Sequence, residues 1–270
     1  MGIGLSIRIA DLVIEDLTGT NKNERLFRKE KSLSTQQEKQ LRNFTQQLLE
    51  NKPVQYVLQE AWFADMKFTV NEAVLIPRPE TEELVELILI DYKKNIHSTE
   101  AFSILDIGTG SGCIPVALKK KIPNAVITAI DISDAAIVIA QKNAVANGMN
   151  IHFIDIDFLD EYNWQSLETY NYIVSNPPYI AQAESGEMEQ HVLNYEPHLA
   201  LFVADNDPLI FYRKIAAFGI THLKNDGVIF VEINQALGLQ TKDVFVQANY
   251  NTLLKKDLFD NDRMIVATKL

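Results

Sequence analysis

The chain has 270 residues, of which 47% are hydrophobic and 23% charged, with 11 Gly and 9 Pro. This composition is typical of a globular protein with one or two domains, and it excludes collagen, a coiled coil and a wholly disordered chain. The 36 acidic and 25 basic residues give a net charge of -11, which disfavours broad nonspecific binding to nucleic acid.

The sequence shows no pattern of a disulfide, a metal site or a membrane segment. Cys113 is the single cysteine, and the five histidines include no close pair at metal-ligand spacing. The apolar stretches are far shorter than the roughly 20 residues that span a bilayer, and charged residues interrupt the first 17 positions, where a signal peptide needs an apolar centre. We therefore expect a cytoplasmic protein that binds no metal and no membrane.

Residues 1–58 are predicted to form a small helical domain. The stretch 34–50 is polar and rich in glutamine, with apolar residues at helical spacing: Leu41, Phe44, Leu48 and Leu49. Residues 59–78 are predicted to form a β-hairpin linker, because 62–70 mixes aromatic and β-branched residues and 73–76 is again apolar. We expect the hairpin to turn at Asn71-Glu72.

Residues 79–270 alternate between apolar runs and helical segments. A helix is expected from Pro79 to about Lys94, with Glu80 and Glu82 in its first turn, where acids suit the positive end of the helix dipole. Solvated charges at a capped helix start are one interpretation of Arg78, Glu80 and Glu82; only a family resemblance would move them towards the active site, so we leave them out of the predicted catalytic residues. Strands are expected at 104–107, 125–130, 151–154, 172–175, 228–233 and 264–268. This alternation predicts an α/β fold with a doubly wound, mostly parallel sheet.

The first of these strands runs into a glycine-rich turn, and its residues are Gly108, Thr109, Gly110, Ser111 and Gly112. Glycines let a backbone approach a ligand closely, and the following helix start offers free N–H donors. The next strand ends at Asp131, about 20 residues after the glycines, the spacing at which an acid meets ribose hydroxyls. The alternating glycines favour an adenosyl cofactor without a pyrophosphate, although a simple tight turn would look similar.

The sequence Asn176-Pro177-Pro178-Tyr179 directly follows the strand at 172–175. Pro177 holds Asn176 extended, and neither proline has an N–H, so the turn presents acceptor oxygens without competing donors. Such a corner suits a planar nitrogen nucleophile: Asn176 and the Pro177 carbonyl would accept its two N–H groups and Tyr179 would stack on its plane. A proline-rich loop that begins with Asn is the structural alternative.

These two motifs together resemble the class I S-adenosylmethionine-dependent methyltransferases that modify amide or amino nitrogens. Further segments resemble the PrmC/HemK family, the glutamine N5-methyltransferases of peptide chain release factors. They are Pro53-Val54-Gln55-Tyr56, Ile76-Pro77-Arg78-Pro79-Glu80-Thr81-Glu82, Tyr195-Glu196-Pro197, Ala200-Leu201 and Asp262-Arg263. The family usually has Gly where this chain has Gln59, and Ala64-Asp65 also departs from its pattern.

The resemblance implies a seven-stranded methyltransferase sheet behind an N-terminal domain that recognises the substrate. It implies methyl transfer from S-adenosylmethionine, which leaves S-adenosylhomocysteine, to the glutamine of the Gly-Gly-Gln motif in class 1 release factors. The turn from Gly108 to Gly112 would hold the methionyl part, Asp131 the ribose, and Phe158 would pack on the adenine. Asn176 would contact both cofactor and substrate, and the predicted substrate-binding set is Asn176, Pro177, Pro178 and Tyr179.

Several points stay open in the sequence. Asp106 either orients the cofactor's amino group, directly or through water, or satisfies loop N–H groups. Methylation of an adenine amino group in nucleic acid is an alternative, because that nucleophile is also a planar NH₂; the charge of -11 and the lack of a basic arm disfavour it. A cofactor-binding partner of the translation machinery without catalysis is a second alternative. We expect a monomer.

Overall fold

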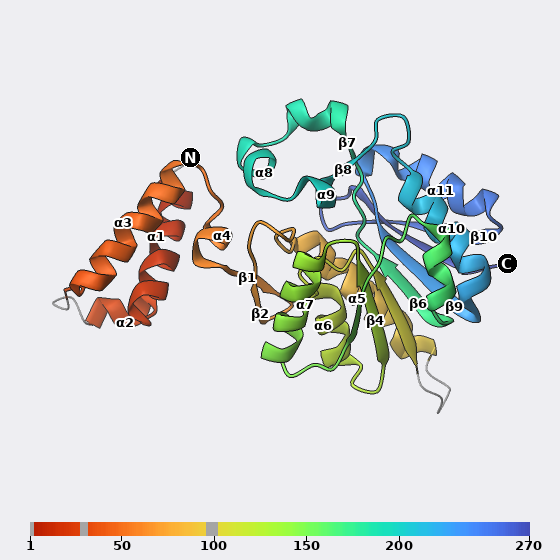
Figure 1. Ribbon diagram of the computed structural model, residues 1–270, viewed down its shortest axis with the longest axis horizontal. Coiled ribbons are helices and arrows are strands. Elements are labelled where there is room, and N and C mark those ends of the chain that lie inside the picture. Colours follow the sequence, from red (N-terminus) through yellow and green to blue (C-terminus); the bar gives the residue numbers. More distant parts are fainter. Residues whose placement is uncertain (1–2, 28–31, 96–101) are drawn as a thin grey trace. The chain divides into compact units, whose positions relative to one another are not determined.

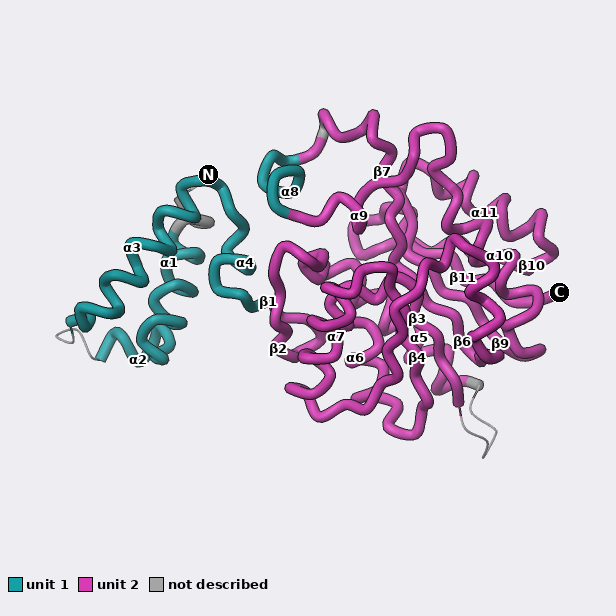
Figure 2. Tube along the Cα trace, in the orientation of Figure 1, with its two compact units in different colours: residues 1–60, 189–195 teal, residues 61–188, 196–270 magenta. Residues whose placement is uncertain are grey.

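The structure is a computed structural model that describes residues 3–27, 32–95 and 102–270. The chain forms two compact units, residues 1–60 with 189–195 (unit 1) and residues 61–188 with 196–270 (unit 2), which Figure 2 colours separately. The division into 1–58, 59–78 and 79–270 stays a prediction. None of the described helices is long and apolar enough to cross a membrane.

Unit 1 is helical, as the sequence predicts for this region, and residues 1–2 and 28–31 of that prediction lie outside the described residues. A return segment from later in the chain completes the unit, and the Tyr195 hydroxyl donates to the Glu50 carbonyl at 2.9 Å. The helices are α1 (Ile3–Thr18), α2 (Lys22–Phe27), α3 (Thr35–Leu49), α4 (Val54–Leu58) and α8 (Gln190–Tyr195).

The start of α3 is fixed by its own side chains. Ser34 and Gln37 form a capping box, which satisfies two of the free N–H groups at the helix N-terminus. The Gln37 amide also donates to the Leu17 carbonyl at 2.6 Å, so it ties α3 to the end of α1. No described side chain of α3 is fully buried, and Leu49 is 74% exposed because the helix ends at that residue.

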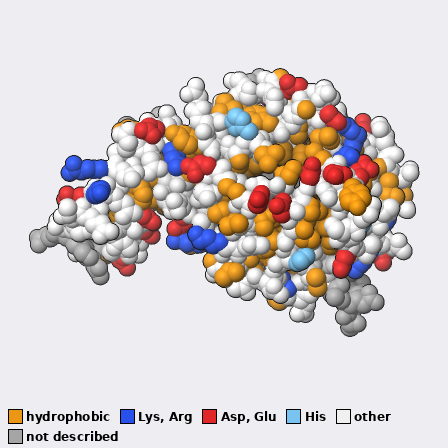
Figure 3. Space-filling model, in the orientation of Figure 1, with side chains coloured by type: hydrophobic (Ala, Val, Ile, Leu, Met, Phe, Trp, Pro, Cys, Tyr) orange, Lys and Arg blue, Asp and Glu red, His pale blue; other side chains and the backbone are white. Residues whose placement is uncertain are grey.

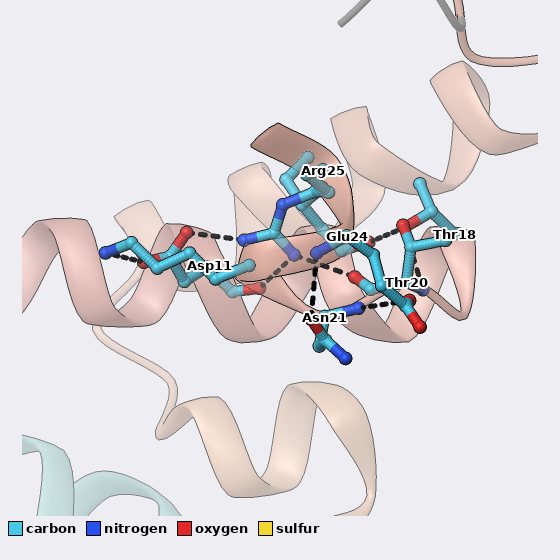
Figure 4. A network of polar contacts seen from close by, with 8 residues as sticks. Asp11, Thr18, Thr20, Asn21, Glu24 and Arg25 are labelled. Atoms are coloured by element: carbon cyan, nitrogen blue, oxygen red, sulfur yellow. Dashed lines mark hydrogen bonds and ion pairs between the residues drawn. The ribbon is translucent and has the colours of Figure 1, made fainter. Parts of the chain in front are cut away.

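A polar network joins α2 to α1 (Figure 4). The Arg25 guanidinium lies 2.5 Å from Asp11, and the Lys22 ammonium lies 2.9 Å from the other oxygen of that carboxylate. The hydrogen bond from Lys22 is the main reason that the pKa of Asp11 is lowered. Asn21 and Glu24 cap α2 reciprocally, with bonds of 3.0 and 3.1 Å between each side chain and the other's N–H. Because exposed ion pairs contribute little free energy, this network mainly sets the angle of the turn.

The hairpin turns earlier than the sequence predicts. Its strands are β1 (Glu60–Phe63) and β2 (Met66–Thr69), so the turn is Ala64-Asp65, and the prediction of Asn71-Glu72 is wrong. Both turn residues have positive φ, 48° and 59°, a conformation that the two central residues of a type I′ turn require. The signal was hidden because neither residue is a glycine. The apolar run 73–76 forms no strand.

A seven-stranded sheet is the centre of unit 2, which confirms the predicted fold class (Figure 1). The strand order is β10-β11-β9-β6-β3-β4-β5. The five strands from β9 to β5 are parallel, while β11 runs antiparallel to both of its neighbours. The strands are β3 (Ser103–Ile107), β4 (Val126–Asp131), β5 (His152–Asp155), β6 (Tyr170–Ser175), β9 (Leu223–Glu232), β10 (Tyr250–Lys256) and β11 (Asp262–Lys269).

Helices cover both faces of this sheet, and residues alternate between two buried cores. In β6, for example, Tyr172 and Val174 belong to the core that α5 and α6 cover, whereas Ile173 belongs to the core that α10 and α11 cover. The predicted helix after Pro79 is confirmed. The longer helices of unit 2 are α5 (Pro79–Asn95), α6 (Cys113–Lys121), α7 (Asp134–Ala146), α10 (Ile210–His222) and α11 (Gly238–Gln247).

Short elements carry the chain over the carboxyl ends of the strands. A two-stranded parallel pair, β7 (Ile180–Ala181) and β8 (Phe202–Val203), encloses this excursion. The other short elements are η1 (Glu161–Ser166), η2 (Gln182–Glu187), α9 (His198–Leu201) and η3 (Gln235–Leu237). Residues 176–179 join β6 to β7 and therefore lie at the sheet edge at which ligands bind in α/β folds.

Candidate active site

The predicted motifs converge because their strands are neighbours. In the parallel pair β3 and β6, Ile107 lies opposite Ser175, and in the pair β3 and β4, Ile107 lies opposite Ile130. The residues that follow these strands therefore leave the sheet at one edge. They surround a cavity of about 340 Å³ in unit 2. This volume is within the usual range for a small-molecule site.

The cavity contacts eight of the predicted site residues, namely Gly108, Thr109, Gly110, Ser111, Asp131, Phe158, Asn176 and Pro178. Three others lie beside it. Gly112 is the residue before α6, and Pro177 is buried in the corner. Tyr179 is half-buried and borders a second cavity of about 250 Å³, together with Glu184, Asn234 and Arg263 among others.

The glycine turn has a left-handed backbone at three positions, with φ of 72° at Gly108, 52° at Gly110 and 77° at Gly112. A Cβ atom at Gly112 would lie 3.0 Å from the Cβ of Ala140 and 3.1 Å from its Cα, whereas a Cβ at Gly110 would meet nothing within 4 Å. Gly112 is thus needed for packing of the turn. Gly110 leaves space open on the cavity side of the turn.

Asp131 fastens the glycine turn to the next strand. One carboxylate oxygen accepts from the Gly110 N–H at 2.8 Å, and the other accepts from the Ser133 N–H at 3.0 Å. Burial raises the pKa of Asp131, and these backbone hydrogen bonds oppose the rise. Because a carboxylate oxygen has two acceptor positions, both oxygens can still accept from a ligand.

Asp106 is fully buried in β3 beneath the turn. Neither of its carboxylate oxygens has a hydrogen-bond partner in the described part of the chain, and the Thr109 hydroxyl is equally unpartnered. The alternative that Asp106 satisfies loop N–H groups is therefore wrong. Burial raises the pKa of Asp106 to about 7, and the nearby Thr109 hydroxyl opposes part of this rise although it forms no hydrogen bond of normal geometry with the carboxylate. A buried hydroxyl without a partner is costly, and because Thr109 contacts the cavity whereas Asp106 does not, Thr109 is the group that a polar ligand could reach.

The far end of the cavity is apolar. Phe158 is 4% exposed, and its ring packs on Trp164 and Phe218 with centroid distances of 5.6 and 5.4 Å. The Trp164 indole N–H donates to the Phe158 carbonyl at 2.9 Å, which fixes the position of Phe158. The cavity thus combines polar backbone at the glycine turn with a rigid apolar wall.

Comparison with known proteins places these observations in a family. A family model described as the PrmC N-terminal domain matches residues 1–58, and one described as the methyltransferase small domain matches residues 87–197. The release factor glutamine methyltransferase of Flavobacterium psychrophilum is 52% identical over 220 residues, which cover 81% of this chain and 76% of that relative. The chain belongs to the release factor glutamine methyltransferase family.

Further members of the family span nearly the whole chain. The relative from Bacteroides thetaiotaomicron is 40% identical over 259 residues, which cover 96% of this chain and 91% of that one. Among solved structures, a methyltransferase from Pyrococcus furiosus aligns with a TM-score of 0.51 at 17% identity, over 84% of this chain and 99% of that one. The 16S rRNA N2 G1207 methyltransferase of Thermus thermophilus aligns with a TM-score of 0.53 at 17% identity, over 78% of this chain and 50% of that one. At this identity the solved structures show the fold alone.

The segment before α5 carries site residues that the sequence interpretation left out. Arg78 is not a solvated charge: its guanidinium lies 2.5 Å from the Glu196 carboxylate, whose side chain is fully buried. The other Glu196 oxygen accepts from the Ile76 N–H at 3.3 Å. This ion pair holds together two segments that line the cavity, one around Arg78 and the other around Pro197. Both segments resemble the PrmC/HemK family, and this resemblance was the sequence signal that could have identified them as part of the site.

Asn176 is held by another residue that the sequence interpretation left out. Its side-chain nitrogen donates to the Thr81 hydroxyl at 3.0 Å, and Thr81 donates to the Glu232 carboxylate at 2.7 Å. Thr81 lies in one of the segments that resemble the PrmC/HemK family. Glu232 is the next-to-last residue of the predicted strand 228–233 and the last residue of β9, and an acid after an apolar run is its only sequence signal. Glu82 is likewise not merely solvated, since it accepts from the Ala64 N–H at 3.0 Å.

Proposed function

We propose that the protein transfers a methyl group from S-adenosylmethionine to the side-chain amide nitrogen of the glutamine in the Gly-Gly-Gln motif of peptide chain release factors. The observation that carries this proposal is one cavity that contacts both the glycine turn and Asn176. Family membership supports it, because the relatives are named as release factor glutamine methyltransferases. We assign recognition of the release factor to unit 1, part of which matches the PrmC N-terminal domain.

The residues around the cavity fit the proposed cofactor. The Thr109 hydroxyl contacts the cavity and has no hydrogen-bond partner in the described part of the chain, so it offers a polar group to the methionyl end, whereas the Asp106 carboxylate lies buried beneath the turn and does not contact the cavity. Asp131 has acceptor capacity left for ribose hydroxyls, and the wall formed by Phe158 suits the adenine. When bound, the cofactor supplies an electrophilic methyl group on a sulfonium.

The task of the protein's own residues is to place a weak amide nucleophile in line with that methyl group. The Asn176 side-chain oxygen and the Pro177 carbonyl would accept the two N–H groups of the glutamine amide. As positive charge develops on the nitrogen, these oxygens stabilise it, and the proton leaves to water. Stacking of Tyr179 on the amide stays a prediction, because Tyr179 borders the second cavity. Burial raises the pKa of Tyr179 to about 12, so the ring remains neutral at pH 7.

Nucleic acid is a weaker candidate for the substrate. An adenine amino group would meet the same acceptor oxygens, but a net charge of -11 repels polyphosphate. On the face shown in Figure 3, groups of acidic side chains and groups of basic ones both lie among hydrophobic side chains.

A labelling assay with two alternative substrates tests the proposal. Purified protein is incubated with isotopically labelled S-adenosylmethionine and either a release factor or nucleic acid from the same cell. We expect label in the release factor, and a mass gain of one methyl group on the Gly-Gly-Gln peptide. A release factor whose motif glutamine is replaced by glutamate is the matched control and should stay unlabelled. Label in nucleic acid, or in neither substrate although the cofactor binds, would contradict the proposal.

A further inference from the structure

The Asn176 amide is connected to a buried carboxylate through one hydroxyl group. Asn176 Nδ2 lies 3.0 Å from Thr81 Oγ1, and Thr81 Oγ1 lies 2.7 Å from Glu232 Oε2. Thr81 is 3% exposed and Glu232 is 2% exposed. Thr81 and Asn176 contact the main cavity, whereas Glu232 does not. A buried acid next to the site, but outside the cavity, has no part in the proposed chemistry described so far.

The fold brings these three residues together from distant parts of the chain. In the parallel pair β6 and β9, Ser175 lies opposite Val231, so Asn176 and Glu232 leave adjacent strands at the same edge. Thr81 lies in the first turn of α5, the helix that covers this end of the sheet. The hydrogen-bond chain therefore depends on the same geometry that forms the cavity.

The number of hydrogen atoms available in the hydrogen bonds between Asn176, Thr81 and Glu232 determines the orientation of the Asn176 amide. The threonine hydroxyl has one hydrogen, and an ionised Glu232 can only accept it. Thr81 must then accept from Asn176, which requires the NH₂ group to face it. In the described part of the chain, no donor reaches Asn176 Oδ1. If the amide were flipped, its oxygen and the carboxylate would compete for one hydrogen, and one buried acceptor would lack a partner.

We propose that Glu232, acting through Thr81, holds the Asn176 amide with its oxygen free toward the cavity, as the acceptor for the substrate's N–H. Thr81 and Glu232 are thus positioning residues for Asn176. This inference deepens the proposed function and rests on it, since it explains how an amide with two similar ends presents its oxygen to the incoming glutamine.

Protonation of Glu232 should weaken this arrangement. Burial raises the pKa of Glu232 to about 7, and the bond from Thr81 opposes that rise. A protonated carboxyl can donate to Thr81, whose own hydrogen is then free to bond Asn176 Oδ1 in the flipped amide. The hydrogen-bond chain Asn176–Thr81–Glu232 should therefore persist above about pH 7, and the Asn176 amide should become free to flip below that pH. The titratable and polar groups that interact with Glu232 are Arg78 before α5, Glu80 and Thr81 in the first turn of α5, Cys113 of α6, Arg263 of β11, Tyr179 after β6 and Tyr212 of α10.

NMR of the full chain without any ligand tests this inference independently of its substrate. The side-chain amide resonances of Asn176 are assigned by their loss in Asn176→Ala. We expect them to titrate with a midpoint near the Glu232 pKa in the unsubstituted protein and in Thr81→Ser, and not in Thr81→Val or Glu232→Gln. Resonances that do not titrate, or that titrate unchanged in Glu232→Gln, would overturn the inference.

Kinetics with a release factor then separates positioning from a structural role. Thr81→Val should lower kcat by at least about tenfold while the cofactor Kd changes less than about twofold, and Thr81→Ser should restore kcat. In the Asn176→Ala background, Thr81→Val should cause no further loss, because the two residues act as one unit. Equal losses in both backgrounds would overturn the inference. If no release factor is methylated, the proposed function fails. The NMR titration still decides whether the hydrogen-bond chain from Glu232 to Asn176 exists.

Discussion

The two loops at the cavity lie after adjacent parallel strands, yet their backbones offer opposite chemistry. After β3, glycines with positive φ form a turn, here called the donor turn (residues 108–112). Its N–H groups at Gly108 and Thr109 donate to the Ile130 carbonyl, that of Gly110 donates to Asp131 and that of Gly112 donates to the Thr109 carbonyl. Within the described part of the chain, this leaves the N–H of Ser111 for a ligand. After β6, two prolines have no N–H at all, so the corner offers the oxygens of Asn176 and Pro177. This difference fits the proposed roles of the two loops, with the cofactor at the donor turn and the nucleophile at the acceptor oxygens of the corner. The predictions below test each side of this difference.

The largest expected effect concerns the acceptor corner. Asn176→Ala removes the side-chain oxygen, so kcat for release factor methylation should fall by at least about 100-fold, the scale seen when a group that stabilises developing charge is removed. The unfolding free energy should change little, and the cofactor Kd should rise far less than kcat falls, although Asn176 is predicted to contact the cofactor as well. Asn251→Ala, an exposed site in β10, is the matched control and should keep full activity. Near-normal turnover of Asn176→Ala would refute the assigned role.

The next effect separates two glycines of the donor turn. Gly112→Ala should lower the unfolding free energy by about 2 to 4 kcal/mol, since it combines strained φ with contact against the Ala140 backbone. Gly110→Ala meets no atom within 4 Å, so only the φ strain of about 1 kcal/mol remains. Its added methyl group should instead weaken cofactor binding by at least about tenfold.

Urea unfolding and calorimetric titration of the two glycine variants check this contrast. Equal destabilisation by both would show that the turn has no open side, and unchanged cofactor binding in Gly110→Ala would remove the turn from the binding site.

A third prediction concerns the unpartnered acid under the donor turn. The pKa of Asp106 is raised to about 7 in the folded protein from 3.8, so the folded state binds more protons between about pH 4 and pH 7. Stability must therefore fall as the pH rises through this window. Asp106→Asn removes this contribution, and its stability relative to the unsubstituted protein should rise by about 2 to 3 kcal/mol from pH 5 to pH 8.

Chemical denaturation at both pH values, without cofactor, measures this difference. An unchanged difference would mean that Asp106 is solvated or paired in solution.

The smallest expected effect concerns the hairpin turn. Ala64 and Asp65 have positive φ there, a backbone conformation that glycines adopt in the donor turn. Asp65 is exposed with φ of 59°. Asp65→Gly should raise the unfolding free energy by about 0.5 kcal/mol, because glycine is preferred at the second central position of a type I′ turn. A thermal melt detects the shift, with the exposed-site variant Asn251→Ala as the control. Destabilisation by Asp65→Gly would show that the side chain has a role of its own.

The fold and the candidate site were predictable to different degrees. Apolar strands that end in glycine or Asn-Pro dipeptides have strong local signals, so the parallel sheet and the residues at its edge could be predicted. β10 could not, because Tyr250 alone is fully buried in this edge strand, the alternate positions Thr252 and Leu254 are half-buried, and its sequence has no apolar run. The hairpin turn was missed for a similar reason, since Ala64-Asp65 lacks a typical turn signature.

The interactions between distant segments were also out of reach. Thr81 and Glu232 are separated by 151 positions, and Arg78 and Glu196 by 118. The apolar run before Glu232 and the motif around Glu196 mark each acid as notable, but neither indicates which distant residue is its partner. Only the packing of α5 over the carboxyl ends of the strands brings these partners together, so a single sequence indicates the reacting residues but not those that orient them.

The most direct test is a structure of this protein with S-adenosylhomocysteine and a peptide that contains the Gly-Gly-Gln motif. The account predicts that the glutamine amide donates to Asn176 Oδ1 and the Pro177 carbonyl, and that its nitrogen faces the cofactor sulfur across the main cavity. A glutamine bound away from this corner, or a cofactor that leaves the glycine turn empty, would contradict it.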